Sequence, residues 1–337
     1  MKICIVTDTW QQINGVSTTL KNTVRCLTEQ GHVVCVIEPN QFWHVPMPGY
    51  HEVQWSINVW RVGPLIERFQ PDAIHIATEG PLGFAARWYC KVTRRSIPHN
   101  TSYHTKMPEY IEQKFHIPVR WTYPVFRLFH KFSHRVLVTN QNMVSELSEQ
   151  GFKNLTVWSR GVDQELYTPD LRSPTTQQDL GPVPVIMCVS RISHEKNLEA
   201  FCELATSGTL VMVGDGPART ELQRRYPHVK WLGYKTGVEL AKCYANADVF
   251  VFPSKTDTFG VVMLESMACG TPVAAYPVTG PVDVIEPGAT GVLHDNLQTA
   301  VDQALLLDRT TVYQHSRCWT WSACTETFVQ NLITIPR

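Results

Sequence analysis

Two acidic side chains, Asp257 and Glu265, lie eight positions apart on either side of a Phe-Gly-Val segment. The second carboxylate falls about one and a half turns into a predicted helix, so both carboxylates can point into one crevice. The backbone N–H groups of Phe259, Gly260 and Val261 lie at the start of this helix, where anions such as phosphate bind. Carboxylates accept hydrogen bonds from hydroxyl groups. The combination therefore fits a sugar diphosphate, with phosphates on the amides and hydroxyls on the acids.

The surrounding chain predicts a strand, a turn and a helix that place these groups at the edge of a parallel sheet. An apolar strand at Asp248–Phe252 precedes a turn, and the helix pattern at Val261–Cys269 ends at Gly270. Ligands bind at the carboxyl ends of such strands. A plainer interpretation is open for each acid taken alone: Asp257 would cap the helix and Glu265 would face solvent.

Two basic residues, Arg191 and Lys196, follow the strand predicted at Val185–Val189, with which a second α/β domain begins. They lie five positions apart across the loop that leads into the next helix. In such a loop an arginine fork and a lysine point charge can converge on a diphosphate. As isolated surface cations they would carry no functional meaning.

The first half of the chain opens with a strand–loop–helix–strand pattern, and Gly15 lies in its loop. A glycine there lets the backbone approach a ligand closely, although the same residue can simply form a turn. The strand predicted within Ile97–Thr105 ends in His104, which places this histidine at the carboxyl edge of a parallel sheet. A structural or solvent-facing histidine is the alternative.

The segment Arg120–Arg135 predicts an amphipathic helix with a basic face. Apolar residues recur at helical spacing, and Arg127 and Lys131 recur with the same spacing on the other face. Such a helix could lie on an anionic membrane, with its aromatic side chains at the level of the headgroups. In the alternative, the apolar face packs on the core and the basic face is solvated.

The composition argues against several classes of protein. The chain has 337 residues with 30 Lys and Arg against 30 Asp and Glu, and this net charge of zero does not favour nucleic acid as a partner. No apolar run is long enough to span a bilayer, and the first residues predict a strand rather than a signal peptide. The ten cysteines form no CxxC pair and the histidines no HExxH motif, which indicates reduced thiols, no metal site and a cytoplasmic protein.

The segment SKTDTFGVVMLESMACGTPV resembles the donor-sugar motif of family-4 retaining glycosyltransferases, in which two glutamates eight positions apart flank an FG turn. The first acid here is Asp257, which leaves the identity of the sugar open. The resemblance covers nearly the whole chain and implies the α/β GT-B fold, with two Rossmann-like domains facing a cleft. It implies an acceptor-binding domain at residues 1–170, a linker at 171–184, a nucleotide-sugar domain at 185–318, and a C-terminal helix at 319–337 that crosses back to the first domain.

The same resemblance implies roles for the residues singled out above. Asp257 would bind hydroxyls of the donor sugar, Glu265 the nucleotide ribose, and His104 the sugar from the opposite domain, and these three are the predicted catalytic residues. No metal or other cofactor is expected, because Arg, Lys and the helix dipole already meet the phosphate charge. The predicted donor-binding residues are Gly15, Arg191, Lys196, Phe259, Gly260, Val261 and Glu265.

The expected reaction is the transfer of a hexose from a UDP- or GDP-sugar to a lipid such as diacylglycerol. The basic helix, Asp257 and the segment Trp158–Asp163 favour this acceptor, because they are similar to bacterial lipid glycosyltransferases. Peripheral attachment to the inner face of the cytoplasmic membrane would follow. The alternatives are a soluble or polysaccharide acceptor, a sugar-nucleotide epimerase on the same fold, and a non-catalytic partner subunit. The intact Arg191, Lys196 and Glu265 argue against the last of these.

Overall fold

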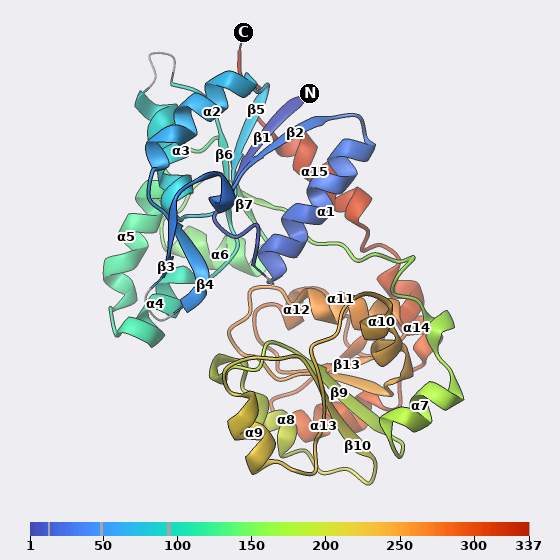
Figure 1. Cartoon of the computed structure of the whole chain (residues 1–337). Helices are drawn as coiled ribbons and strands as arrows, with labels where there is room; N and C mark the ends of the chain where they lie inside the picture. Colours follow the sequence, from blue (N-terminus) through green and yellow to red (C-terminus); the bar gives the residue numbers. More distant parts are fainter. Residues whose placement is uncertain (13, 48–49, 93–95, 337) are drawn as a thin grey trace. The chain divides into compact units, whose positions relative to one another are not determined.

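The computed structural model describes residues 1–12, 14–47, 50–92 and 96–336, and the chain forms two compact units (Figure 1). The first unit contains Met1–Arg160 and Trp321–Arg337, and the second contains Gly161–Thr320. Each unit has one six-stranded parallel sheet with helices packed against it. This confirms the predicted α/β class and its two Rossmann-like halves.

In the first unit the strand order is β2-β1-β5-β6-β7-β8. The strands are β1 (Lys2–Val6), β2 (Val33–Ile37), β5 (Ala73–Ile76), β6 (Asn100–Tyr103), β7 (Val136–Val138) and β8 (Leu155–Val157). The α-helices are α1 (Gly15–Glu29), α2 (Val62–Phe69), α3 (Pro81–Val92), α4 (Met107–Phe115), α5 (Val119–His130), α6 (Gln141–Glu149) and α15 (Trp321–Asn331). Short 3-10 turns, η1 (Pro39–Gln41) and η2 (Val59–Arg61), lie between β2 and α2.

In the second unit the strand order is β11-β10-β9-β12-β13-β14. The strands are β9 (Val185–Val189), β10 (Thr209–Val213), β11 (Lys230–Gly233), β12 (Val249–Phe252), β13 (Val273–Ala275) and β14 (Gly291–Leu293). The α-helices are α7 (Pro174–Leu180), α8 (Leu198–Cys202), α9 (Arg219–Arg225), α10 (Gly237–Asn246), α11 (Val261–Ala268), α12 (Pro281–Val284), α13 (Leu297–Ala304) and α14 (Arg309–Ser316). The 3-10 turns η3 (Pro169–Leu171) and η4 (His194–Lys196) precede α7 and α8.

The second sheet has a topological switch point between β9 and β12. Its order, counted within the unit, is 3-2-1-4-5-6, the order of the dinucleotide-binding fold. The two central strands run in parallel and pair through Ile186 and Val249. Their chains then leave in opposite directions, so the loops after them open a crevice at the carboxyl edge, where ligands bind in such sheets.

Apolar runs explain why the strands form where the sequence predicted them. The central strands β9 and β12 read VIMCV and VFVF and are buried almost throughout. A strand buried on both faces shows such continuous runs rather than alternation. Helix α1 begins at Gly15 because the side chain of Asn14 accepts a hydrogen bond from the N–H of Ser17 at 2.9 Å.

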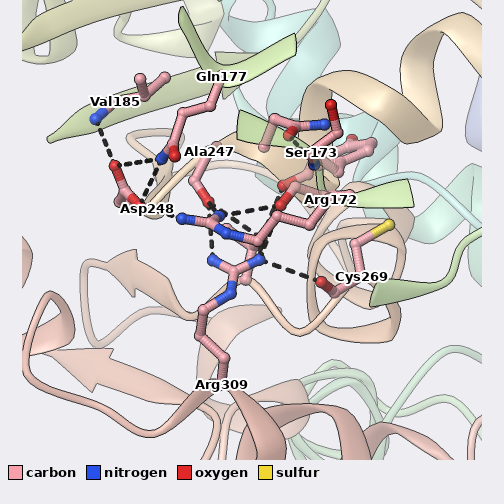
Figure 2. Close-up of polar contacts among 12 residues, drawn as sticks. Arg172, Ser173, Gln177, Val185, Ala247, Asp248, Cys269 and Arg309 are labelled. Atoms are coloured by element: carbon pink, nitrogen blue, oxygen red, sulfur yellow. Dashed lines mark hydrogen bonds and ion pairs between the residues drawn. The ribbon is translucent and has the colours of Figure 1, made fainter. Parts of the chain in front are cut away.

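The segment predicted as an interdomain linker, residues 171–184, is a helical part of the second unit. Helix α7 begins after Ser173, whose hydroxyl accepts from the N–H of Thr176. Arg172 donates to Asp248 Oδ1 at 2.7 Å and to the carbonyls of Ala245 and Ala247 at 3.0 Å (Figure 2). The prediction was wrong because polar side chains of this segment form hydrogen bonds inside the unit, with Asp248 and neighbouring carbonyls.

Arg309 binds the same polar cluster, since it shares the carbonyl of Ala247 with Arg172. Its guanidinium donates to the carbonyls of Ala247 and Cys269 and to Thr271 Oγ1, at 2.7, 3.2 and 2.8 Å (Figure 2). We expect Arg309→Met to lower the free energy of unfolding by about 3 kcal/mol, because buried acceptors lose their donor. Thermal unfolding measures this, with exposed Arg224→Met as the control. Equal melting temperatures for the two variants would contradict this account.

An antiparallel hairpin lies between η1 and η2 in the first unit. The hairpin consists of β3 (His44–Met47) and β4 (Tyr50–Ser56), and residues 48 and 49 lie outside the described part. Strand β3 contains Pro46, which an edge strand tolerates.

The C-terminal helix α15 belongs to the first unit, as the GT-B resemblance implied. It packs on α1, and the Nε1–H of Trp158 donates to the carbonyl of Cys324 at 3.2 Å. Among the residues that the structure describes, no helix has the length and apolar character needed to cross a bilayer.

Candidate active site

The loops that leave β9 and β12 meet at the switch point of the second unit. Lys196 Nζ lies 2.5 Å from Asp257 Oδ1, and the side chain of Asn197 donates to the carbonyl of Pro253 at 3.0 Å. The two charged side chains are each about a quarter exposed, at 23% and 25%. The structure thus pairs a predicted diphosphate ligand with a predicted sugar ligand, at a point that solvent reaches.

The turn into α11 requires a glycine at position 260. Gly260 has a φ of 88°, and a Cβ there would lie 2.8 Å from Met263 Cε and 2.9 Å from Phe252 Cζ. The neighbouring Phe259 is buried, and its ring packs edge-on against Trp319 with centroids 5.8 Å apart. This anchoring holds the first turn of α11 in place. N–H groups in a first helical turn have no partner within the helix and can bind an anion.

The Arg191 side chain is exposed on the loop after β9. The loop itself is held by its backbone: the N–H of Ile192 donates to the carbonyl of Asp215 at 2.9 Å. Gly214 makes this close approach possible, because a Cβ there would lie only 1.9 Å from the carbonyl oxygen of Ser190. Arg191 is therefore carried on a fixed loop, the one that also carries Lys196.

Glu265 has different partners from Asp257. Its Oε2 accepts from the hydroxyl of Tyr244 at 2.9 Å, and the Tyr167 hydroxyl also donates to the carboxylate. Burial raises the pKa of Glu265 to about 7, although both tyrosines act in the opposite direction. The prediction that both acids face one crevice is not tested by these contacts. The two tyrosines were missed, because nothing in their sequence positions marks them as partners of this acid.

In the first unit, His104 follows β6 at the carboxyl edge of the sheet and is buried. Arg160 NH2 lies 2.8 Å from His104 Nδ1, and Trp158 packs against the imidazole with centroids 5.6 Å apart. Gly15 is exposed at the start of α1, and a Cβ added there would meet nothing within 4 Å. The fold itself therefore does not require a glycine at this position.

Two further acids at this edge were not predicted. Asp8 follows β1, and its carboxylate lies at the N-terminus of α3. There it accepts hydrogen bonds from the N–H of Leu82 and from Thr78 Oγ1, both at 2.9 Å. Burial raises the pKa of Asp8 to about 6. Glu79 Oε1 lies 3.2 Å from His130 Nε2 in a buried contact. Asp8 has the contacts of a helix cap, and Glu79 fixes the end of α5 against the sheet.

In the described ranges, no cluster of three or more His, Cys, Asp or Glu side chains could hold a metal ion. The absence of a metal or other cofactor from the reaction stays a prediction.

Two Rossmann-like units, with paired Lys196 and Asp257 beside a helix N-terminus, are the features of a GT-B enzyme that handles a nucleotide sugar. Comparison with known proteins agrees. A family model described as Glycosyltransferase Family 4 matches residues 13–166, and one described as Glycosyl transferases group 1 matches residues 183–307.

Named relatives and a solved structure extend this match. The chain is 30% identical over 318 residues to a GDP-mannose-dependent alpha-mannosyltransferase of Mycobacterium tuberculosis, with 87% of this chain and 83% of the relative covered. It is 26% identical over 317 residues to the alpha-monoglucosyldiacylglycerol synthase of Streptococcus pneumoniae, with 82% and 71% covered. Its fold is similar to sucrose-phosphate synthase from Thermosynechococcus elongatus, with a TM-score of 0.79, 18% identity and 98% of each chain covered.

The chain therefore belongs to glycosyltransferase family 4, and it is a hexosyltransferase of the GT-B fold that uses a nucleotide sugar.

Proposed function

We propose that this enzyme transfers a hexose, with retention of configuration, from a UDP- or GDP-sugar to a lipid such as diacylglycerol at an anionic membrane surface. Support for the acceptor comes from the name of the monoglucosyldiacylglycerol synthase relative and from an exposed apolar stripe on α5. The stripe is the observation that carries the proposal.

In the proposed donor site, Arg191, Lys196 and the amides of Phe259, Gly260 and Val261 stabilise the charge that develops on the leaving diphosphate. Such fixed donors and charges stabilise a transition state more than they stabilise the bound substrate. Asp257 accepts hydrogen bonds from the donor sugar and Glu265 from the ribose. The close pairing of Lys196 with Asp257 supports this division, because phosphate arriving at the ammonium would release the carboxylate for hydroxyl groups.

Helix α5 carries its apolar side chains on two separate faces. Phe126 and Phe129 are buried in the unit. Trp121, Val125 and Leu128, spaced by four and three residues, are exposed instead, and Trp121 is 67% exposed. Residues at such spacing share one helix face. The helix thus presents an apolar stripe to solvent, in addition to the face that packs on the core.

Helix α3 lies beside α5 (Figure 1) and also carries exposed apolar side chains. Arg87 joins the two helices by donating to the carbonyls of Leu128 and Phe129, both at 2.7 Å. Its neighbour Trp88 is 65% exposed. Exposed tryptophans are typical of membrane interfaces, where the amphipathic ring sits among the headgroups.

Basic side chains flank the stripe. Lys131 and Lys91 lie close to the Phe132 ring, with ammonium-to-centroid distances of 5.7 and 4.7 Å. Arg127, which we propose faces the membrane, is exposed, but it also donates to the carbonyl of Gln150 at 3.1 Å, at the end of α6. Neutralising Arg127 would therefore disturb the fold as well as any membrane contact. The attraction of such cations to anionic lipid supports a membrane rather than an apolar protein partner.

A transfer assay tests the proposed reaction. It crosses UDP- and GDP-hexoses with diacylglycerol in vesicles and with water-soluble glycosides, with and without EDTA, and identifies products by mass spectrometry. We expect a glycosylated diacylglycerol whose yield EDTA does not change. Transfer only to soluble glycosides would overturn the lipid acceptor and keep the donor site. Conversion of the donor sugar without any acceptor would indicate an epimerase.

A binding experiment tests the membrane surface separately. We expect Trp88→Ser combined with Trp121→Ser to weaken binding to vesicles of phosphatidylglycerol and phosphatidylcholine at least about a hundredfold, since burying each large apolar side chain contributes about 1.5–3 kcal/mol. Sedimentation with vesicles measures the affinity. The control combines Tyr234→Ser and Leu306→Ser, two exposed side chains of the second unit. Equal binding by both double variants would contradict a membrane-binding role for α5.

A further inference from the structure

Arg160 is the last residue of the first unit in this part of the chain, and the structure gives it a specific partner. Its NH2 group lies 2.8 Å from His104 Nδ1, and both side chains are buried. We infer that Arg160 is a positioning residue that fixes His104 as a neutral imidazole with its proton on Nε2. One part of this inference rests on the proposed function, namely that an oxygen of the donor sugar accepts the hydrogen bond from the Nε2–H group.

The hydrogen bond decides the tautomer. A guanidinium has only donors, so Nδ1 of His104 must accept from Arg160. A neutral imidazole carries a single N–H, which then lies on Nε2. His104 can therefore donate a hydrogen bond to a ligand through Nε2 but cannot accept a proton there.

The surroundings also oppose a charged His104. The charged and titratable groups that face it are Arg160 after β8, His75 on β5 and His130 on α5. Burial contributes most, and these three groups add repulsion, so the pKa of His104 lies well below its usual 6.5. Burial lowers the pKa of Arg160 only to about 10, which leaves the guanidinium charged at neutral pH. The imidazole thus stays neutral over the whole physiological range.

Arg160 is itself held by the residues that follow β8, which are in turn bound to α15. Its NH1 group donates to the carbonyls of Trp158 and Ser159 at 2.8 and 3.0 Å, and its Cζ lies 5.1 Å from the centre of the Trp158 ring. The carbonyl of Ser159 also accepts from Cys324 Sγ, on α15. Arg160 is the last residue of the first unit before the chain enters the second at Gly161. An arginine with so many fixed contacts can set the orientation of the ring.

Nitrogen-15 NMR of the histidine-labelled enzyme, without any substrate, tests the tautomer directly. His104→Asn identifies the resonances of His104 by their loss. We expect a protonated Nε2, an unprotonated Nδ1 and no titration between pH 5 and 9. A protonated Nδ1, or a titration near pH 6.5, overturns the inference. This result does not depend on transferase activity, and it is obtained on the unmutated chain.

Two variants separate the charge of Arg160 from its hydrogen bond. Arg160→Gln retains an N–H donor and loses the charge, so we expect the same tautomer and a higher pKa for His104 than in the unmutated chain. Arg160→Met loses both, so we expect a mixture of tautomers as well. His228 of the second unit, whose Nε2 lies 3.0 Å from the carbonyl oxygen of Cys202, serves as the internal reference that should not change. An unchanged His104 spectrum in folded Arg160→Met overturns the role of Arg160. If that variant does not fold, the tautomer measured in the unmutated enzyme decides.

Kinetic measurements test whether the hydrogen bond between Arg160 and His104 affects hexose transfer. We expect Arg160→Met to lower kcat/KM for the donor roughly tenfold, and Arg160→Gln to stay within about threefold of the unmutated enzyme at pH 8. Exposed Arg135→Gln is the control for loss of an arginine in the same unit. Equal losses in both Arg160 variants would overturn positioning through the hydrogen bond. Absence of any transfer by the unmutated enzyme would contradict the proposed function, while the NMR result still decides the tautomer.

Discussion

Lys196→Ala is expected to lower the rate of hexose transfer roughly a thousandfold, because it removes a fixed positive charge from the place where charge develops on the leaving diphosphate. The same change should leave the melting temperature almost unaltered. Lys196 pairs with Asp257 at a partly exposed position, and such ion pairs contribute only about 0–1 kcal/mol to folding. Donor turnover and thermal unfolding, measured on the same preparation, separate the two effects.

A second lysine in the same unit provides a matched control. Lys242 Nζ lies 3.6 Å from Glu239 Oε1, so Lys242→Ala also removes a lysine and an ion pair. We expect Lys242→Ala to retain full activity. Transfer by Lys196→Ala at the level of this control would remove Lys196 from the donor site, and a large drop in melting temperature would indicate a structural role instead.

Donor affinity is expected to rise about tenfold between pH 6 and pH 8 and then to level off. Glu265 has a pKa of about 7 in the unliganded chain, and hydroxyl groups of a ribose favour its ionised form. Below pH 7 the carboxyl group must release its proton before it can accept hydrogen bonds from the ribose hydroxyls as a carboxylate. Each unit by which the pH falls therefore weakens the binding free energy of the donor by up to about 1.4 kcal/mol. Titration calorimetry in buffers of different ionisation enthalpy measures both the affinity and the protons released.

Two variants test whether Glu265 is the responsible group. Glu265→Gln should bind the donor weakly and without this pH dependence, and it should transfer hexose at least a hundredfold more slowly. Tyr244→Phe removes a hydrogen bond to the carboxylate, which raises the pKa of Glu265 and shifts the rise in affinity to higher pH. An unshifted profile in Tyr244→Phe, or an unchanged one in Glu265→Gln, would assign the titration to another group.

Local patterns predicted most of the architecture, because buried parallel strands leave a plain signal. Short β-branched and aromatic runs such as Val249–Phe252 favour a buried strand, and Gly260 and Gly270 mark the ends of the helix that follows. The segment at residues 171–184 was mistaken for a linker for the opposite reason. Its polar side chains resemble those of a loop, and only the tertiary structure supplies Asp248 as a partner for Arg172.

The candidate site shows the same division between local and distant information. Spacing along the chain identified Asp257, Lys196 and Glu265 as candidate site residues. It could not predict that Lys196 pairs with Asp257 across the switch point. Periodicity found the amphipathic character of α5 without separating the buried Phe129 from the exposed Leu128, because both side chains are apolar. Which of two apolar faces meets the core depends on neighbouring elements, here the sheet and α3.

The central claim is that the switch point of the second unit binds the diphosphate of the donor. A crystal structure of the enzyme with a non-hydrolysable UDP- or GDP-hexose tests it most directly. We predict that the diphosphate contacts Lys196, Arg191 and the N–H groups of the first turn of α11, with the ribose hydroxyls on Glu265. A nucleotide bound elsewhere, with the Lys196–Asp257 pair intact and Glu265 still on Tyr244, would contradict the account.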